Sequence, residues 1–122
     1  MTAMVLTAPI LPGKVEAWRR FCQEINGRRR REYERSRRQL GIASEAVWLL
    51  RTARADIAVV RLDADEPEHL LSRLAASDQP FDRWFKERLH AICGLDLNPA
   101  LLGPTMELIF TWQQSSVVKK EQ

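Results

Sequence analysis

The sequence predicts a single domain of the α+β class, and three observations support this. First, a chain of 122 residues with 45% hydrophobic residues fits one domain with a real core. Second, apolar runs typical of strands alternate with stretches in which apolar residues recur at helical spacing. Third, the strand-like runs 45–52 and 56–64 are separated by a short link, which indicates an antiparallel hairpin.

The chain before this hairpin is expected to form a strand and a long helix. Residues 3–11 are a continuous apolar run, which is typical of a buried strand. Helical spacing of apolar residues begins soon after and includes Val15, Trp18, Cys22 and Ile25. Gly27 interrupts the pattern, which resumes as far as Leu40, and Gly41 is the residue type expected just beyond a helix end. We therefore predict helical structure up to Leu40, with an interruption at Gly27.

Two further helices are expected after the hairpin. Asp65 and Glu68 have the spacing of a capping box, and Pro67 would lie in the first turn of the helix that follows. Another helix is predicted from an opening turn at Pro80 to an end just before Gly94.

The last predicted strand is 105–112, and the residues after it are mostly polar. We assign 1–113 to one domain and 114–122 to a flexible C-terminal tail.

The predicted order of strands and helices is that of the ferredoxin-like βαββαβ fold, in which helices cover one face of an antiparallel sheet. When one face of an antiparallel sheet is exposed to solvent, apolar and polar residues should alternate along each strand. The segments 47–50 and 105–112 instead carry apolar residues on both faces. Since no predicted helix is left to cover the second face, we expect the sheet of a second copy to cover it, giving a homodimer.

Four stretches, PGKVEAWRRF, EYERSRRQLGI, VWLL and SDQPFDRWFKERL, make residues 11–112 similar to a bacterial family described only as a domain of unknown function. The predicted dimer with face-to-face sheets resembles the dimeric α+β barrel superfamily, which includes small monooxygenases, isomerases and haem-degrading enzymes. The resemblance implies a dimeric ferredoxin-like barrel. It supplies no catalytic residues, and the sequence shows no clear haem-binding histidine.

The segment from Gly27 to Gly41 holds seven arginines and two glutamates, against a net charge of +3 for the whole chain. The remainder of the chain is therefore slightly acidic. On a helical wheel Arg28, Arg30, Arg31, Arg35, Arg37 and Arg38 lie at the flanks or back of the apolar face. Arg28 is expected to pair with Glu32, and Arg30 and Arg38 with Glu34. A solvated, ion-paired helix is the preferred interpretation, and nucleic-acid binding is not expected.

Polar residues continue the inner face of the same helix: Arg29, Glu32, Tyr33 and Ser36. They either satisfy one another as a structural network or line a cleft between helix and sheet that holds a small ligand. In the second case Tyr33 is the candidate proton donor, Arg29 is a candidate clamp for an anion, and Glu32 and Ser36 also contact the ligand.

Three further residues complete the candidate ligand site. Arg88 falls within the apolar stripe of the helix that begins at Pro80, and Glu107 stands alone among the apolar residues of the last strand. Arg88 is expected either to pair with a carboxylate, with Glu107 as the candidate partner, or to reach solvent through its long side chain. The pair would be a structural salt bridge or part of the ligand site, and in the second case Arg88 is a candidate clamp for an anion. Trp48 is expected either in the core or as a wall of the pocket.

No cofactor or metal site is expected. His69 and His90 are expected at the surface, and the two cysteines, Cys22 and Cys93, are expected to be buried free thiols. The N-terminus lacks a basic leader and an apolar run long enough to span a membrane, so a cytoplasmic location is expected.

The function expected from these features is the binding or transformation of a small organic molecule in a cleft between helix and sheet. Whether the protein is an enzyme stays open, since that step would rest on fold analogy alone. The alternative is a non-catalytic dimeric module whose arginine-rich helix face meets an acidic partner protein.

Overall fold

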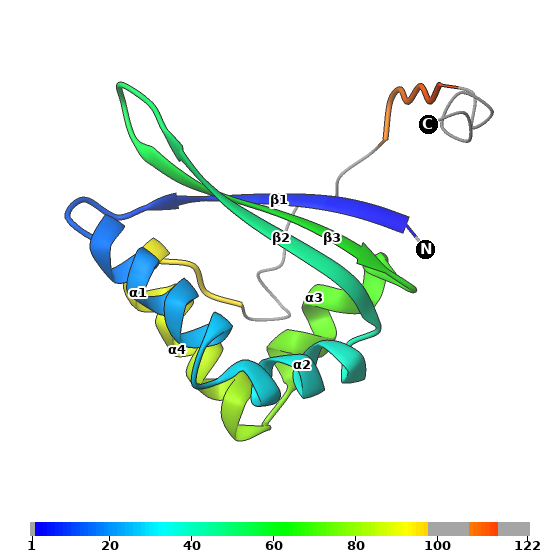
Figure 1. Cartoon of the computed structure of the whole chain (residues 1–122), viewed down its shortest axis with the longest axis horizontal. Coiled ribbons are helices and arrows are strands. Elements are labelled where there is room, and N and C mark those ends of the chain that lie inside the picture. The colour runs from blue at the N-terminus through cyan, green and yellow to red at the C-terminus, as the bar shows by residue number, and fades with distance from the viewer. Residues whose placement is uncertain (1, 98–107, 115–122) are drawn as a thin grey trace.

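A computed structural model describes residues 2–97 and 108–114, and its elements confirm the α+β class (Figure 1). The strands are β1 (Thr2–Ile10), β2 (Ile42–Arg51) and β3 (Asp56–Ala64). The helices are α1 (Val15–Asn26), α2 (Arg30–Gln39), α3 (Pro67–Ala76) and α4 (Pro80–Cys93). No helix among these residues is long and apolar enough to cross a membrane.

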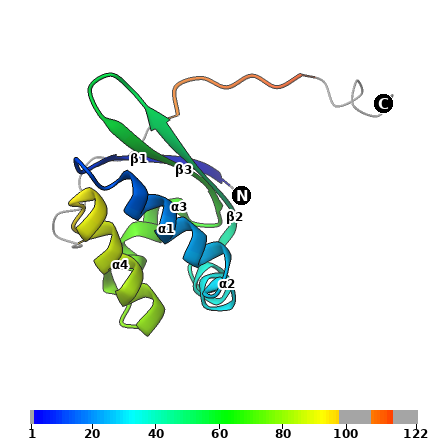
Figure 2. The same ribbon diagram turned by 60° about the vertical axis from the view of Figure 1, so that its left-hand side comes forward.

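The strands form one antiparallel sheet in the order β1-β3-β2, and β2 with β3 forms the predicted hairpin. Thr52 closes the hairpin loop, because its hydroxyl oxygen accepts a hydrogen bond of 3.0 Å from the backbone N–H of Ala55. All four described helices lie against the same face of the sheet (Figures 1 and 2). No helix of the described residues lies against the other face.

The helical stretch up to Leu40 is two helices with different directions, and the change occurs between Asn26 and Arg30 (Figure 1). The backbone N–H groups of Gly27 and Arg29 both donate to the carbonyl oxygen of Glu24, at 3.3 and 2.9 Å. A Cβ atom at Gly27 would lie 3.0 Å from the backbone oxygen of Gln23, so glycine permits this tight turn. A wheel drawn continuously from α1 therefore places the residues of α2 incorrectly.

The ends of the later helices agree only in part with the sequence predictions. Pro67 occupies the first turn of α3 as predicted, but the N-cap residue is Glu66 and no side chain caps the helix. The predicted capping box of Asp65 and Glu68 is therefore wrong. The Glu66 carboxylate instead accepts a hydrogen bond of 2.6 Å from Arg73, about two turns further along the helix surface.

Gly94 confirms the predicted end of α4. It is left-handed (φ 68°), and its N–H donates to the carbonyl oxygen of His90. Glycine adopts this backbone conformation without a steric penalty.

The predicted last strand is not seen. Residues 105–107 lie outside the described part of the chain, and 108–114 form no regular secondary structure. Among them Leu108, Ile109, Phe110 and Trp112 are 73–81% exposed. Within the described residues the sheet therefore has three strands, and β1 keeps one edge unpaired.

The core lies between the sheet and the helices. It is built around Phe21, whose ring centroid lies 5.4–5.6 Å from those of Trp18, Trp84 and Phe85. Such tilted aromatic pairs add to the stabilisation that burial provides.

The outer face of the sheet is exposed and partly apolar. Trp48, Leu50 and Val5 are 52%, 49% and 39% exposed. Trp48 sits opposite Val59 in the β2–β3 register, on the side away from the helices. Its predicted alternatives, core residue or pocket wall, are therefore both wrong for the single chain, because the side-chain alternation of β2 turns Trp48 outward.

Candidate ligand cavity and its polar end

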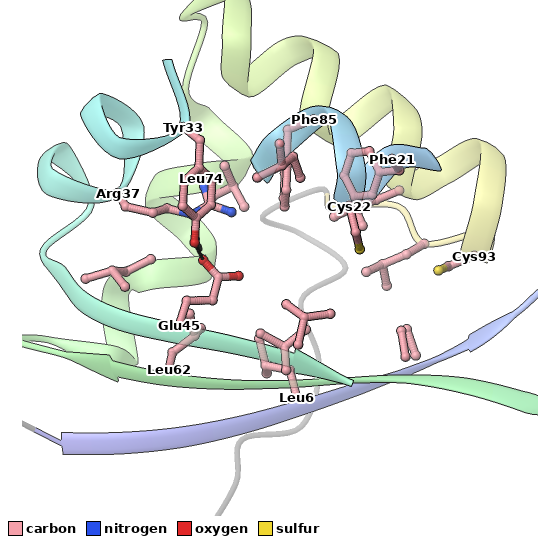
Figure 3. A pocket seen from close by; sticks show the side chains of 18 of the residues that line it. Leu6, Phe21, Cys22, Tyr33, Arg37, Glu45, Leu62, Leu74, Phe85 and Cys93 are labelled. Atoms are coloured by element: carbon pink, nitrogen blue, oxygen red, sulfur yellow. Dashed lines mark hydrogen bonds and ion pairs between the residues drawn. The ribbon is translucent and has the colours of Figure 1, made fainter. Parts of the chain in front are cut away.

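A cavity of about 580 Å³ lies between the inner face of the sheet and the helices (Figure 3). Its lining is mainly apolar, with Leu6, Val60 and Leu62 on the sheet side and Phe21, Leu74 and Phe85 on the helix side. Small-molecule sites typically have volumes of about 300–1,000 Å³ and a mainly apolar lining with few polar groups. Size and lining thus match those of a ligand site.

Three polar residues gather at one end of this cavity: Tyr33, Arg37 and Glu45 (Figure 3). The Tyr33 hydroxyl donates a hydrogen bond of 2.5 Å to Glu45 Oε1, and Arg37 Nε donates one of 2.9 Å to the same oxygen. Tyr33 and Arg37 lie one turn apart on α2, and Glu45 is on β2 opposite Leu62, an inward position of β3. The group therefore joins a helix to the sheet.

Arg37 is buried, which contradicts the prediction that it lies at the flank or back of its helix. Its side chain is 8% exposed, and that of Glu45 is 9% exposed. The guanidinium lies 4.7 Å from the ring centroid of Tyr33 and 4.5 Å from that of Phe85. A buried charge needs a partner and hydrogen bonds, and Glu45 supplies both. The turn at Gly27 is the reason for the error, because it rotates α2 relative to α1.

Tyr33 is held in its protonated form. Its burial, followed by the negative charge of Glu45 and the hydrogen bond to it, raises the pKa of the Tyr33 phenol well above its usual value. The hydroxyl is therefore a stable hydrogen-bond donor to Glu45. Giving up its proton, the role expected of it as an acid, would leave an unfavourable phenolate beside a carboxylate.

Ser36 belongs to a second buried network, which braces α2 against α4 and which Arg37 joins to the polar end of the cavity. Its hydroxyl donates a hydrogen bond of 2.5 Å to Asp82, and Ser77 donates one of 2.6 Å to the other oxygen of that carboxylate. Asp82 is 2% exposed. Arg37 Nη1 also donates to the Ser36 hydroxyl oxygen at 3.2 Å. Ser36 itself does not line the cavity among its described residues, so its contacts correspond to the structural alternative.

Arg29 and Glu32 lie away from the cavity. The Arg29 guanidinium stacks 4.1 Å from the ring centroid of Trp84 and pairs with Glu24 at 3.7 Å and Glu32 at 3.4 Å. Neither Arg29 nor Glu32 is among the described lining residues. The four polar residues of the predicted inner face are thus divided, and only Tyr33 reaches the cavity.

The predicted pair of Arg88 and Glu107 cannot be followed, because Glu107 lies outside the described residues. Arg88 is exposed, which agrees with the alternative in which its long side chain reaches solvent.

Of the predicted ion pairs on α2, Arg30 with Glu34 is confirmed at 2.9 Å. Arg28 pairs with Glu24 at 2.6 Å and not with Glu32. No pair between Arg38 and Glu34 is present in the described part of the chain.

Cys22 and Cys93 are free thiols, and both line the cavity. Burial, followed by the negative charge of Glu45 and then by Cys93, raises the pKa of Cys22 to about 11. Burial also raises the pKa of Cys93. Because a thiolate is the reactive form of cysteine, neither thiol is activated for nucleophilic attack.

A small cluster on the surface of α3 brings Glu66, Glu68 and His69 within metal-binding distance of one another. All three are exposed, and Glu66 is already bonded to Arg73. Exposed acidic groups commonly lie together in this way without any ligand. Both histidines are at the surface, as predicted.

Sequence reasoning missed Glu45 and Arg37, the two charged members of the polar end. A signal for Glu45 was available: it is an acidic residue on the same strand face as Val47 and Leu49, in a strand expected to be covered on both faces. No comparable signal existed for Arg37, whose direction depends on the turn between α1 and α2.

Comparison of the chain with models of known protein families, with curated proteins and with solved structures found no match. The resemblance to an uncharacterised bacterial family therefore gains no support from these comparisons.

Proposed function

We propose that this protein binds a small organic molecule in the cavity between its helices and its sheet. One observation carries the proposal. A mainly apolar cavity of about 580 Å³ has a buried, hydrogen-bonded ion pair with an attached phenol at one end. A cavity serving only as a packing defect would have no need of polar groups, whose burial costs free energy. Polar groups at one end of an apolar cavity would fix the orientation of a ligand.

The proposal concerns binding first, and catalysis only secondarily. Among the described lining residues, Glu45 is the only carboxylate, and a carboxylate at the end of an apolar cavity can accept a proton from a bound molecule. If the protein transforms its ligand, Glu45 is therefore the group we expect to act as the base. Tyr33 and Arg37 would then position it.

The proposed assembly is a homodimer of ferredoxin-like domains whose sheets pack face to face. The exposed Trp48, Leu50 and Val5 support it, since they place apolar area on the face without helices. Arg61 and Asp63 lie on the same face and pair at 2.9 Å within the chain. A second copy related by two-fold symmetry would bring the same two charges to the interface in opposite order, so the face is complementary to itself.

The second candidate function is an interaction module that uses the exposed side of α2. Arg31, Arg35 and Arg38 are exposed, follow one another at helical spacing, and form no ion pair in the described part of the chain. This favours an acidic partner protein. Binding of such a partner should weaken strongly with salt and be lost on changing these arginines to glutamate, while cavity variants should leave it unchanged.

Native mass spectrometry of the protein purified without added ligand tests the first proposal. We expect a bound small molecule that is released on unfolding. Val60→Phe, which fills the cavity from β3, should abolish binding of this molecule. Val59→Phe, which changes the adjacent residue on the opposite face of the same strand, should leave its binding unchanged. A bound mass that survives Val60→Phe would contradict the proposal. So would a wild-type protein that carries nothing and takes up no added apolar probe such as 2-methoxynaphthalene.

A further inference from the structure

At the polar end of the cavity, one strong hydrogen-bond acceptor has no donor among the described residues. Tyr33 and Arg37 both donate to Oε1 of Glu45, and Oε2 has no hydrogen bond to any described residue. In Figure 3 one oxygen of this carboxylate meets the Tyr33 hydroxyl, and the other faces the open space between the helices and the sheet.

This free oxygen is accessible from the cavity. Figure 3 shows it turned toward the space between the helices and the sheet, and it is not among the fully buried side-chain oxygens of the described residues that lack a partner. The Glu45 side chain is only 9% exposed and lines the cavity. A carboxylate oxygen so deeply placed needs a donor, because an unsatisfied buried acceptor costs free energy.

The charge balance at this end determines which kind of donor fits. The negative charge of Glu45 is already paired with Arg37 at 2.9 Å. A ligand ammonium group would bring a second positive charge close to Arg37 and would lose its hydration in an apolar cavity. A ligand carboxylate would meet Glu45 Oε2 directly, with repulsion. A neutral O–H or N–H group satisfies the oxygen without adding a charge.

We infer that the cavity selects an apolar molecule bearing a neutral hydrogen-bond donor, a hydroxyl or an amide N–H, which donates to Glu45 Oε2. This inference rests on the proposed function, since it names the ligand class of the same cavity. The apolar walls hold the body of the molecule, and the carboxylate sets its orientation.

Four naphthalene probes of similar size test the inference: 2-naphthol, 2-methoxynaphthalene, 2-naphthoate and 2-naphthylmethylammonium. Calorimetric titration of the wild-type protein at pH 7 should show 2-naphthol binding at least about tenfold more tightly than the other three, the gain expected of a hydrogen bond to a charged acceptor. If 2-methoxynaphthalene binds as tightly as 2-naphthol, the donor inference is wrong while the proposed cavity function stands. If no probe binds, the proposed function itself fails.

Glu45→Gln assigns the preference to this carboxylate. The amide oxygen can still accept from Tyr33 and Arg37, which turns the NH₂ group toward the cavity and replaces an acceptor by a donor. The ratio of 2-methoxynaphthalene to 2-naphthol dissociation constants should fall from at least about ten toward one. Glu34→Gln, at an exposed ion pair on α2, is the matched control and should keep the wild-type ratio. An unchanged ratio in Glu45→Gln overturns the inference.

A second measurement avoids any loss of stability in the Glu45 variant. In the wild-type protein the carboxyl ¹³C resonance of Glu45 should shift on addition of 2-naphthol and much less on addition of 2-methoxynaphthalene. Equal shifts with both probes, or none with 2-naphthol, would also overturn the inference.

Discussion

Arg37 Nε lies 2.9 Å from Glu45 Oε1, and this ion pair, with both side chains at least nine-tenths buried, links α2 to β2 at the polar end of the cavity. The two residues are eight positions apart in the sequence, and the chain between them includes the end of α2 and Gly41. The pair therefore fixes how the helix meets the sheet. It also places a carboxylate in a cavity that is otherwise mainly apolar.

Loss of one partner of this pair should destabilise the fold strongly. Glu45→Ala leaves the Arg37 guanidinium buried without a counter-charge, and we expect the free energy of unfolding to fall by about 3–5 kcal/mol. Glu34→Ala, which removes a partner from the exposed pair with Arg30, should cost less than about 1 kcal/mol. Urea unfolding followed by circular dichroism measures both. If both substitutions lowered the free energy of unfolding equally, the buried ion pair would not contribute more to stability than the exposed one, and the account of it would be wrong.

The single tyrosine of the chain makes the polar end observable by ultraviolet absorbance. Its pKa is raised in the folded state, so between the usual value of about 10 and the folded value the unfolded chain binds fewer protons than the native one. Stability should therefore fall as pH rises above about 10. We expect tyrosinate absorbance at 295 nm and loss of the circular dichroism signal to appear together. A tyrosinate transition near pH 10 in a chain that stays folded would contradict the burial of Tyr33 beside Glu45.

The cavity thiols should react slowly in the native protein. Because the pKa of Cys22 is raised to about 11, little of this thiol is ionised at pH 8. We therefore expect Cys22 in the native protein to react with a disulfide reagent on the order of 100-fold more slowly than a thiol of ordinary pKa in the unfolded chain. Cys93→Ser isolates the signal of Cys22. Since both thiols line the cavity, 2-naphthol should slow the reaction further. If Cys22 reacted rapidly in the native protein and 2-naphthol did not slow the reaction, this would contradict a buried cavity that 2-naphthol occupies.

The outer face of the sheet should carry the dimer contact. Native mass spectrometry is expected to give a mass of about twice the 14.1 kDa chain for the wild type. Trp48→Glu places a charge in the middle of this face and should give the monomer, whereas Arg38→Glu, on the exposed side of α2, should remain dimeric. A dimer that tolerates Trp48→Glu and is lost with Arg38→Glu would move the interface to the helices.

The sequence predicted the parts of this molecule that depend on local patterns. The hairpin of β2 and β3, the proline in the first turn of α3 and the glycine beyond α4 follow from residue type and spacing, and they are present. The direction of α2 could not be predicted in this way, because it depends on one turn held by two hydrogen bonds to the Glu24 carbonyl oxygen. That turn decides that Arg37 is buried and that Arg29 stacks on Trp84.

The candidate site was predicted only in part for the same reason. Tyr33 was identified because it continues an apolar helix face, and it does line the cavity. Its partner Glu45 comes from a strand twelve residues later, and its inward direction depends on the register with Leu62. A contact of this kind, between a helix and a strand, cannot be predicted from the residue periodicity of either element.

The most direct test of ligand binding in the cavity is an NMR measurement of contacts between bound 2-naphthol and the methyl groups of the sheet. Isotope-filtered nuclear Overhauser effects should connect the naphthol protons to Leu6, Val60 and Leu62 on the inner face. Contacts to Val5 and Leu50 on the outer face, with none to the inner methyl groups, would place the binding surface elsewhere and contradict a ligand site between the helices and the sheet.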